Sequence, residues 1–153
     1  MIGFEERWDA HRAIEGIILG YADAVDTGDF ERVAGYFRHG RIRVYGRDSV
    51  YEGVDGVLDV FRSYTRVYEG TPSTKHVTTN ILIDVETRSS AKAQSYFTVL
   101  QARPELPLQV VIAGRYRDTY ERRDGTWWLT DRLGFCDLIG NLGAHLQDHP
   151  DLQ

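Results

Sequence analysis

The stretch YADAVDTGDFERVAGYF, residues 21–37, carries the strongest local signal for the fold of this chain. An apolar helical pattern ends within it, TGD at residues 27–29 interrupts the pattern, and FERVAGYF at residues 30–37 resumes it. Asp29 stands where its carboxylate can cap the first amides of the second helix. The stretch therefore predicts two helices that are joined by a tight break.

The residues before this break predict a longer helix, from Trp8 to Val25, with Asp9 as its N-cap. Its apolar residues recur at three- and four-residue steps and form one stripe: Trp8, Ile14, Ile17, Ile18, Tyr21 and Val25. After the break, RIRVY at residues 41–45 is a strand candidate. YEGVDGVLDVFRSYTRVY at residues 51–68 then predicts a third helix.

Beyond residue 75 the apolar period changes to two, which is typical of strands. Four β-rich segments follow: HVTTNILIDV (76–85), AKAQSYFTVLQ (91–101), LQVVIAGRYRDTYERR (108–123) and TWWLTDRLGF (126–135). Asp124-Gly125 predicts a two-residue hairpin turn, and RPELP at residues 103–107 predicts a loop. Helices followed by consecutive antiparallel strands predict an α+β domain, whose curved sheet leaves a concave space for a small molecule.

Composition narrows the class of protein. The 153 residues predict one domain, 1–153, with a core at about 8–140 and a C-terminal tail at 141–153. A net charge of −5 without a basic stripe disfavours nucleic acid as a partner. The single cysteine, Cys136, the lack of a signal segment and the lack of a membrane-length apolar run predict a cytoplasmic protein that does not bind membranes.

Motifs for known cofactors are absent from the sequence, which has no P-loop, no G-x-G-x-x-G, no G-x-S-x-G and no C-x-x-C. We therefore expect no nucleotide, flavin, haem or metal cofactor. His145 and His149 in HLQDH have a spacing that a metal pair can use, but they lie in a polar stretch without other placed ligands. A solvated terminus is the simpler interpretation of that stretch.

Asp26 occupies an unusual position, on the shoulder of the apolar stripe in the last turn of the first helix. Burial and the negative end of the helix dipole should both raise its pKa toward the range of a general base. The alternative is that its carboxylate accepts from the amides of Thr27 or Gly28 in an Asx-turn. A catalytic interpretation therefore needs a partner for Asp26.

His76 is the best candidate for that partner. In its strand, Val77, Thr79, Ile81, Ile83 and Val85 should form one β-branched face. The opposite face, with His76, Thr78, Asn80 and Leu82, is then either a surface or the wall of a polar pocket. A lone strand histidine is commonly only a surface residue, so this face alone does not decide between the two.

The whole pattern resembles a known family. YADAVDTGDFERVAGYF, the KH at residues 75–76 and RYRDTYERRDGTWWLTDR at residues 115–132 are together similar to the SnoaL-like branch of the nuclear transport factor 2-like superfamily. That branch includes scytalone dehydratase, bile-acid 7α-dehydratase and hexachlorocyclohexane dehydrochlorinase. The resemblance implies a cystatin-like, cone-shaped α+β barrel, with three N-terminal helices packed on a strongly curved antiparallel sheet.

The same resemblance implies catalytic residues. Asp26 and His76 fall at the positions of an Asp–His dyad, Tyr21 at a tyrosine or lysine position, and Arg132 at a pocket arginine that assists the leaving group. Arg132 has a second interpretation, a surface ion pair with Asp131 or Glu121. Scytalone dehydratase-like members use a further histidine on a later strand, where SYFT at residues 95–98 stands here.

These residues predict a cofactor-independent lyase or isomerase of the dehydratase type, in which His76 is the general base that acts on a small, hydrophobic, cyclic molecule. The expected substrate-binding residues are Tyr45, Phe61, Tyr64, Asn80, Tyr96, Thr98, Tyr116 and Phe135. The alternatives are an aldol catalyst of the polyketide cyclase type and a non-catalytic ligand-binding or assembly module. Apolar residues on both faces of the sheet, with the resemblance, further predict a homodimer or homotrimer.

Overall fold

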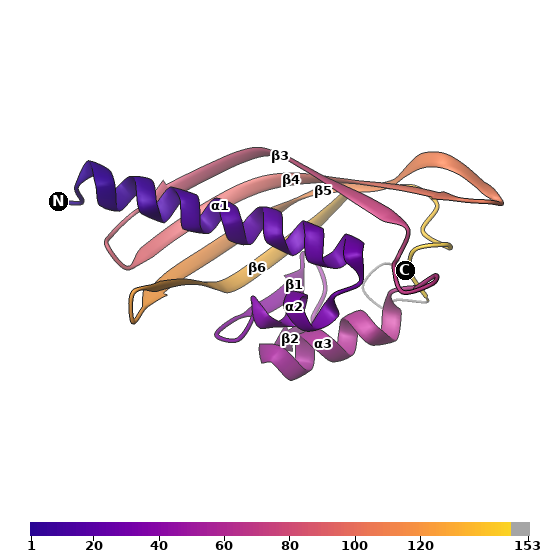
Figure 1. Ribbon diagram of the computed structural model, residues 1–153, viewed down its shortest axis with the longest axis horizontal. Coiled ribbons are helices and arrows are strands. Elements are labelled where there is room, and N and C mark those ends of the chain that lie inside the picture. The colour runs from indigo at the N-terminus through magenta and orange to yellow at the C-terminus, as the bar shows by residue number, and fades with distance from the viewer. Residues whose placement is uncertain (148–153) are drawn as a thin grey trace.

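The computed structural model describes residues 1–147. These residues form three α-helices and six β-strands (Figure 1). The elements in chain order are α1 (Phe4–Thr27), α2 (Phe30–Gly35), β1 (Arg41–Val44), β2 (Val50–Glu52), α3 (Gly53–Tyr64), β3 (Thr74–Val85), β4 (Ser90–Arg103), β5 (Leu106–Arg123) and β6 (Thr126–Ile139). No helix within this part of the chain has the length and apolar character needed to cross a membrane.

One six-stranded sheet organises the molecule, with strand order β2-β1-β6-β5-β4-β3. All neighbouring strands are antiparallel except β1 and β6, which run parallel. Helix α1 lies along one face of the curved sheet, and α2 and α3 lie beside β1 and β2 (Figure 1). The expected α+β architecture of helices on a curved sheet is confirmed, with one parallel strand pair as the departure from an antiparallel sheet.

Two details at the start of α1 differ from the sequence expectations. Gly3 is the N-cap, and its amide donates to the Glu6 carboxylate, so the prediction that Asp9 caps the helix was wrong. Trp8 is 56% exposed and does not belong to the buried stripe. The stripe consists of Ala10, Ile14, Ile18, Tyr21, Ala22, Ala24 and Val25. The helix begins a turn earlier because Glu5 and Glu6 suit a helix N-terminus.

The break after α1 follows the expected chemistry. Gly28 has a φ of 75° in the left-handed region, and its amide donates to the carbonyls of Ala24 and Val25. A Cβ atom at Gly28 would lie only 2.2 Å from the Gly70 carbonyl oxygen, so a side chain does not fit there. The Asp29 carboxylate accepts from the Arg32 amide at 3.0 Å and caps α2 as predicted. Asp26 is thereby fixed in the last turn of α1.

Two predicted segments have different boundaries. Residues 51–68 do not form one helix, because Val50–Glu52 pairs with β1 as strand β2 and α3 begins only at Gly53. RPELP is not a loop, since Arg103 and Leu106 still pair and only residues 104–105 turn. The hairpin turn at Asp124-Gly125 is confirmed, with φ angles of 50° and 81°.

A β-bulge divides β3 into two halves. The pairing with β4 shifts register between Thr79 and Leu82, and Asn80 lies in the left-handed region with a φ of 53°. The more buried residues before the bulge are Thr74, His76 and Thr78, and those after it are Ile81, Ile83 and Val85. The expected single β-branched face was therefore wrong, because Val77 points outward while Ile81 points inward. The bulge places His76 on the same face as the core.

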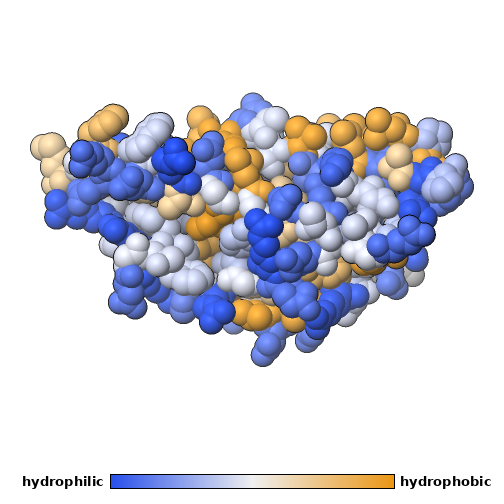
Figure 2. All heavy atoms as spheres, viewed as in Figure 1, coloured by the Kyte–Doolittle hydropathy of each residue, from blue (hydrophilic) through white to orange (hydrophobic). Residues whose placement is uncertain are grey.

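We call this face the inner face of the sheet. On β4 its residues are fully or nearly buried: Ala91, Ala93, Ser95, Phe97, Val99 and Gln101. The outer face carries exposed apolar side chains, including Val77, Tyr96 and Leu138. Figure 2 shows hydrophobic atoms along the upper edge of the molecule, above β3 and the β4–β5 hairpin. The predicted homo-oligomer rests on this face and stays a prediction.

The chain after β6 is held against the domain. Within the C-terminal segment, residues 141–147, Leu146 forms a β-bridge with Thr65 and the Gln147 amide donates to the Tyr64 carbonyl. The Ala144 carbonyl accepts from the Gln101 amide nitrogen at 3.0 Å and from the Tyr68 hydroxyl at 2.6 Å. The interpretation of His145 as part of a solvated terminus was thus wrong, whereas His149 lies outside the described residues.

Candidate active site

Asp26 and His76 form a buried hydrogen-bonded pair where α1 ends and β3 begins. The His76 Nδ1 lies 2.6 Å from the Asp26 Oδ1, and the His76 backbone amide donates to Oδ2 at 2.7 Å. The Thr74 hydroxyl donates to Oδ1 at 2.9 Å. Both side chains are about nine-tenths buried. The carboxylate therefore fixes both the backbone and the ring of His76.

The charge on Asp26 follows from these contacts. Burial alone would raise the pKa of Asp26, but the hydrogen bonds and charge of His76, with the Thr74 hydroxyl, hold that pKa below its ordinary value. The expected upward shift was wrong, because the carboxylate is saturated with donors. An ionised Asp26 requires a proton on His76 Nδ1, so the neutral ring keeps its lone pair on Nε2. This tautomer is the one that a general base needs.

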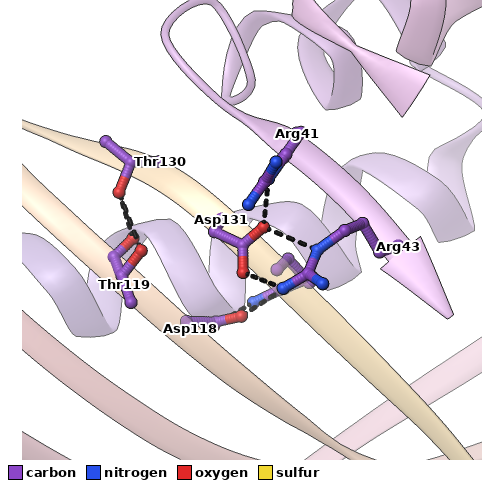
Figure 3. A network of polar contacts seen from close by, with 7 residues as sticks. Arg41, Arg43, Asp118, Thr119, Thr130 and Asp131 are labelled. Atoms are coloured by element: carbon purple, nitrogen blue, oxygen red, sulfur yellow. Dashed lines mark hydrogen bonds and ion pairs between the residues drawn. The ribbon is translucent and has the colours of Figure 1, made fainter. Parts of the chain in front are cut away.

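Arg132 lies on the inner face of the sheet and is buried, not at the surface. Its guanidinium is fully buried and donates to both carboxylate oxygens of Asp118, from Nε at 2.9 Å and from Nη2 at 2.7 Å. The Tyr120 hydroxyl donates to the same carboxylate at 2.9 Å. The surface pairs with Asp131 or Glu121 are not formed, since Asp131 instead accepts from Arg41 and Arg43 (Figure 3). Arg132 is held by Asp118.

Two tyrosines cover the Arg132 guanidinium. Its central carbon lies 4.3 Å from the ring centre of Tyr21 and 4.1 Å from that of Tyr116, which are cation–π distances. Burial raises the pKa of Tyr21, although the charge of Arg132 and a hydrogen bond with Tyr116 oppose the shift. Burial likewise raises the pKa of Tyr116 well above its ordinary value. Both phenols therefore remain protonated and can act as hydrogen-bond donors.

An apolar pocket of about 160 Å³ opens between α3, β1, β6 and the C-terminal segment. It is lined by Ile42, Arg43, Val44, Tyr51, Val60, Phe61, Tyr64, Thr65, Cys136 and Leu146. Its size is comparable to that of an apolar cavity that accommodates one small ring. Phe61 packs edge-on against Tyr21, and Leu146 follows His145, which contacts His76. The pocket is thus linked to Tyr21 through Phe61 and to His76 through the segment that carries His145 and Leu146.

The expected substrate-binding residues divide between the two faces. Phe61, Tyr64 and Tyr116 lie inside, in the pocket or against Tyr21. Tyr96 and Thr98 alternate with buried Ser95 and Phe97 and therefore point to the outer face. Tyr45 is 67% exposed and stacks on Phe135, which Arg115 and Arg117 cover from outside. Asn80 is exposed in the bulge.

His145 is the functional candidate that sequence reasoning missed. Its ring is 6% exposed and lies edge-on to the His76 ring, with 6.2 Å between the ring centres. The sequence signal was weak, because HLQDH is polar and only the spacing of Leu142 and Leu146 around His145 suggests a docked segment. A histidine does lie beside His76, but it comes from beyond the last strand.

A metal-binding arrangement is not found in residues 1–147, where no three His, Cys, Asp or Glu side chains converge on one point. The possible pairing of His145 with His149 falls partly outside these residues. His145 itself faces His76 rather than solvent.

Solved structures with the same fold span nearly the whole chain. A proposed scytalone dehydratase from Novosphingobium aromaticivorans is 21% identical, with a TM-score of 0.71 over 92% of this chain and 98% of that chain. An NTF2-like protein with a cystatin-like fold from the same species is 18% identical, with a TM-score of 0.72 over 90% and 87% of the two chains. A hexachlorocyclohexane dehydrochlorinase from Novosphingobium barchaimii is 22% identical, with a TM-score of 0.73 over 92% and 95%.

These structures establish the NTF2-like, cystatin-like fold, since their sequence identities are too low to carry an activity. None of the curated proteins matches the chain. The family model for the SnoaL-like domain matches residues 6–132, a range that contains the helix break, the dyad and Arg132. On this evidence the chain belongs to the SnoaL-like domain family.

Proposed function

We propose that this protein is a cofactor-independent lyase or isomerase of the dehydratase type, with His76 as its general base. The observation that carries the proposal is the buried Asp26–His76 hydrogen bond: in the tautomer that donates from Nδ1 to the carboxylate, Nε2 is the basic nitrogen. The substrate class is a small, hydrophobic, cyclic molecule that carries an acidic C–H bond next to a carbonyl group. The apolar pocket lined by Phe61 and Leu146 suits such a ring.

The proposed reaction begins with proton transfer from that carbon to His76 Nε2. The ionised Asp26 favours the imidazolium that forms, and the C–H electron pair moves into an enolate. The phenol of Tyr21 or Tyr116 donates to the enolate oxygen, where negative charge develops. If the next carbon carries a hydroxyl group, the electron pair expels it, and the proton from His76 completes a water molecule. Without a leaving group, return of the proton to another carbon is an isomerisation.

Arg132 has a positioning role in this proposal. Its guanidinium is bound by both oxygens of Asp118 through Nε and Nη2, whereas Nη1 is buried without a partner among residues 1–147. It lies against the rings of Tyr21 and Tyr116 and thereby fixes the two phenols. The names of two structural relatives, a proposed dehydratase and a dehydrochlorinase, support elimination as the reaction class.

The test is proton abstraction from 3-hydroxycyclohexanone in D₂O, followed by NMR. Deuterium exchange next to the carbonyl reports proton transfer, and formation of cyclohexenone reports loss of water. His76→Gln should lower both rates by about 10² to 10⁴, the usual contribution of a general base. His39→Gln is the matched control, because His39 contacts Trp128 away from the dyad. Equal rates in wild type and His76→Gln would overturn the proposal and favour a ligand-binding module.

A further inference from the structure

The C-terminal segment brings a second imidazole to the candidate site. The Arg66 amide donates to the His145 carbonyl at 2.8 Å, and Gln101 and Tyr68 both donate to the carbonyl of the preceding Ala144. These three bonds come from β4 and from the chain after α3. His145 is therefore held in a defined position, with its ring against that of His76.

One nitrogen of the His145 ring, Nδ1, is buried without a hydrogen-bond partner among the described residues. Buried nitrogen atoms of this kind normally have a partner, since they have lost their contact with water. The Ser95 hydroxyl is likewise buried without a partner among residues 1–147, and it lies on the same inner face, beside Tyr116 in the sheet. Gln101 Oε1 and Arg132 Nη1, on the same face of the sheet, are also buried without a partner among residues 1–147.

The charge state of His145 decides which ligand suits it. Burial, together with the charge of His76, lowers the pKa of His145 to about 4, and the charge of Asp26 opposes the shift. The ring is therefore neutral at ordinary pH, with one N–H donor and one acceptor nitrogen. A neutral imidazole pairs well with a hydroxyl or carbonyl oxygen. Carbon-bound chlorine is a poor hydrogen-bond acceptor and would leave the nitrogen unpaired.

We propose that His145 hydrogen-bonds an oxygen of the substrate, so that the site selects oxygenated ring compounds, ketones or alcohols, over halogenated compounds of the same size. This inference rests on the proposed function for the place of the substrate beside His76. It also gives that function a substrate class, which points to dehydration or isomerisation rather than dehydrohalogenation. A site with a buried polar group discriminates strongly against an analogue that lacks the matching atom.

The experiment compares cyclohexanone with chlorocyclohexane, which share a ring and differ in the polar atom. Binding to the full chain is followed by NMR of protein with labelled histidine rings. We expect cyclohexanone to shift the His145 ring signals and to bind at least about tenfold more tightly than chlorocyclohexane. His145→Leu should abolish this preference by weakening ketone binding alone, whereas His39→Leu should keep it. Equal affinities in wild type, or a preference that survives His145→Leu, would overturn the inference.

Two further variants separate the loss of the His145 hydrogen bond from a disturbed segment, and the inference about His145 from the proposed function. His145→Gln retains an amide that can bond an oxygen, so it should keep part of the preference even if leucine disturbs the segment. His76→Gln should keep the full preference, because it removes the base and leaves His145 in place. A loss of exchange with the preference intact would thus support both proposals. If wild type shows the ketone preference but no exchange, the proposed function fails and the inference about His145 stands.

Discussion

Two buried acid–base pairs lie on the inner face, and they are built in opposite ways. Asp118 and Arg132 are fully buried, joined by two hydrogen bonds, and enclosed by Tyr21, Tyr116 and Tyr120. Asp26 and His76 are also buried, and the Asp26 carboxylate is just as well supplied with donors. The ring of His76, however, bonds the acid through only one of its two nitrogens.

This difference separates a structural pair from a chemical one. In the Asp118–Arg132 pair the acid binds the guanidinium in the two-point geometry that fixes orientation most firmly. In the Asp26–His76 pair the acid orients the histidine, and the second nitrogen remains available for a proton. Breaking the first pair should therefore cost stability, whereas changes around the second should alter proton chemistry with smaller costs in stability.

The largest effect is expected at Asp118. Asp118→Ala leaves the Arg132 charge buried and unpaired, which should lower the free energy of unfolding by about 3–5 kcal/mol. Urea denaturation measures the loss. Asp131→Ala is the control, because Asp131 pairs with the half-exposed Arg41 and Arg43 (Figure 3) and should cost only about 1 kcal/mol. Similar losses in the two variants would contradict the structural role of the inner pair.

His145, which lies beside the Asp26–His76 pair, should make the stability of the folded chain depend on pH. The unfolded chain binds a proton on this ring below pH 6.5, whereas the folded chain binds one only near pH 4. Stability should therefore fall as pH decreases from 6.5 to 4, by as much as about 3 kcal/mol, since one pKa unit corresponds to ~1.4 kcal/mol. Urea denaturation of wild type and His145→Leu across this range measures the difference. A parallel decline in the two proteins would argue against a neutral buried His145.

The family resemblance supplied the Asp26–His76 dyad, whose residues lie 50 positions apart in the chain. Helix-end and strand signals placed Asp26 in the last turn of a helix and His76 at the head of a strand, but these signals alone did not pair the two residues. The fold class follows from the same signals. Phe61, Tyr64 and Tyr116 were found because their segments keep a regular period.

The missed features depend on long-range contacts. Asn80 reverses the face of β3 through a bulge that alternation alone does not reveal, and Tyr96 and Thr98, which were expected to bind substrate, lie on the outer side of β4. The partner of Arg132 lies 14 residues away on a neighbouring strand, and a cross-strand register decides it. His145 reaches the dyad through long-range contacts of its segment, among them the bonds from Gln101 and Tyr68 to the carbonyl of Ala144.

Asp26→Asn should have an intermediate effect on stability. The pKa of Asp26 is lowered in the folded chain, so the carboxylate adds stability above its ordinary pKa of 3.8, and this stability is lost as pH falls through the lower folded value. The variant should therefore be less stable by about 1–2 kcal/mol at neutral pH, and the two proteins should converge in acid. The downfield ring N–H signal of His76 should also disappear. An unchanged signal would show that Nδ1 does not donate to Asp26.

The smallest effect on stability is expected at Asn80. This residue is not part of the Asp26–His76 pair, but it lies in the bulge that sets the direction of His76. Its φ of 53° favours Asn or Gly over Ala, so Asn80→Ala should cost about 1 kcal/mol and Asn80→Gly almost nothing. Urea denaturation separates the two. If Asn80 instead bound substrate through its amide, as the sequence suggested, both variants would reduce turnover of 3-hydroxycyclohexanone alike. Equal turnover in wild type and Asn80→Gly would show that Asn80 has a structural role in the bulge. The register of the bulge turns His76 toward Asp26, so that only one of its ring nitrogens bonds the acid.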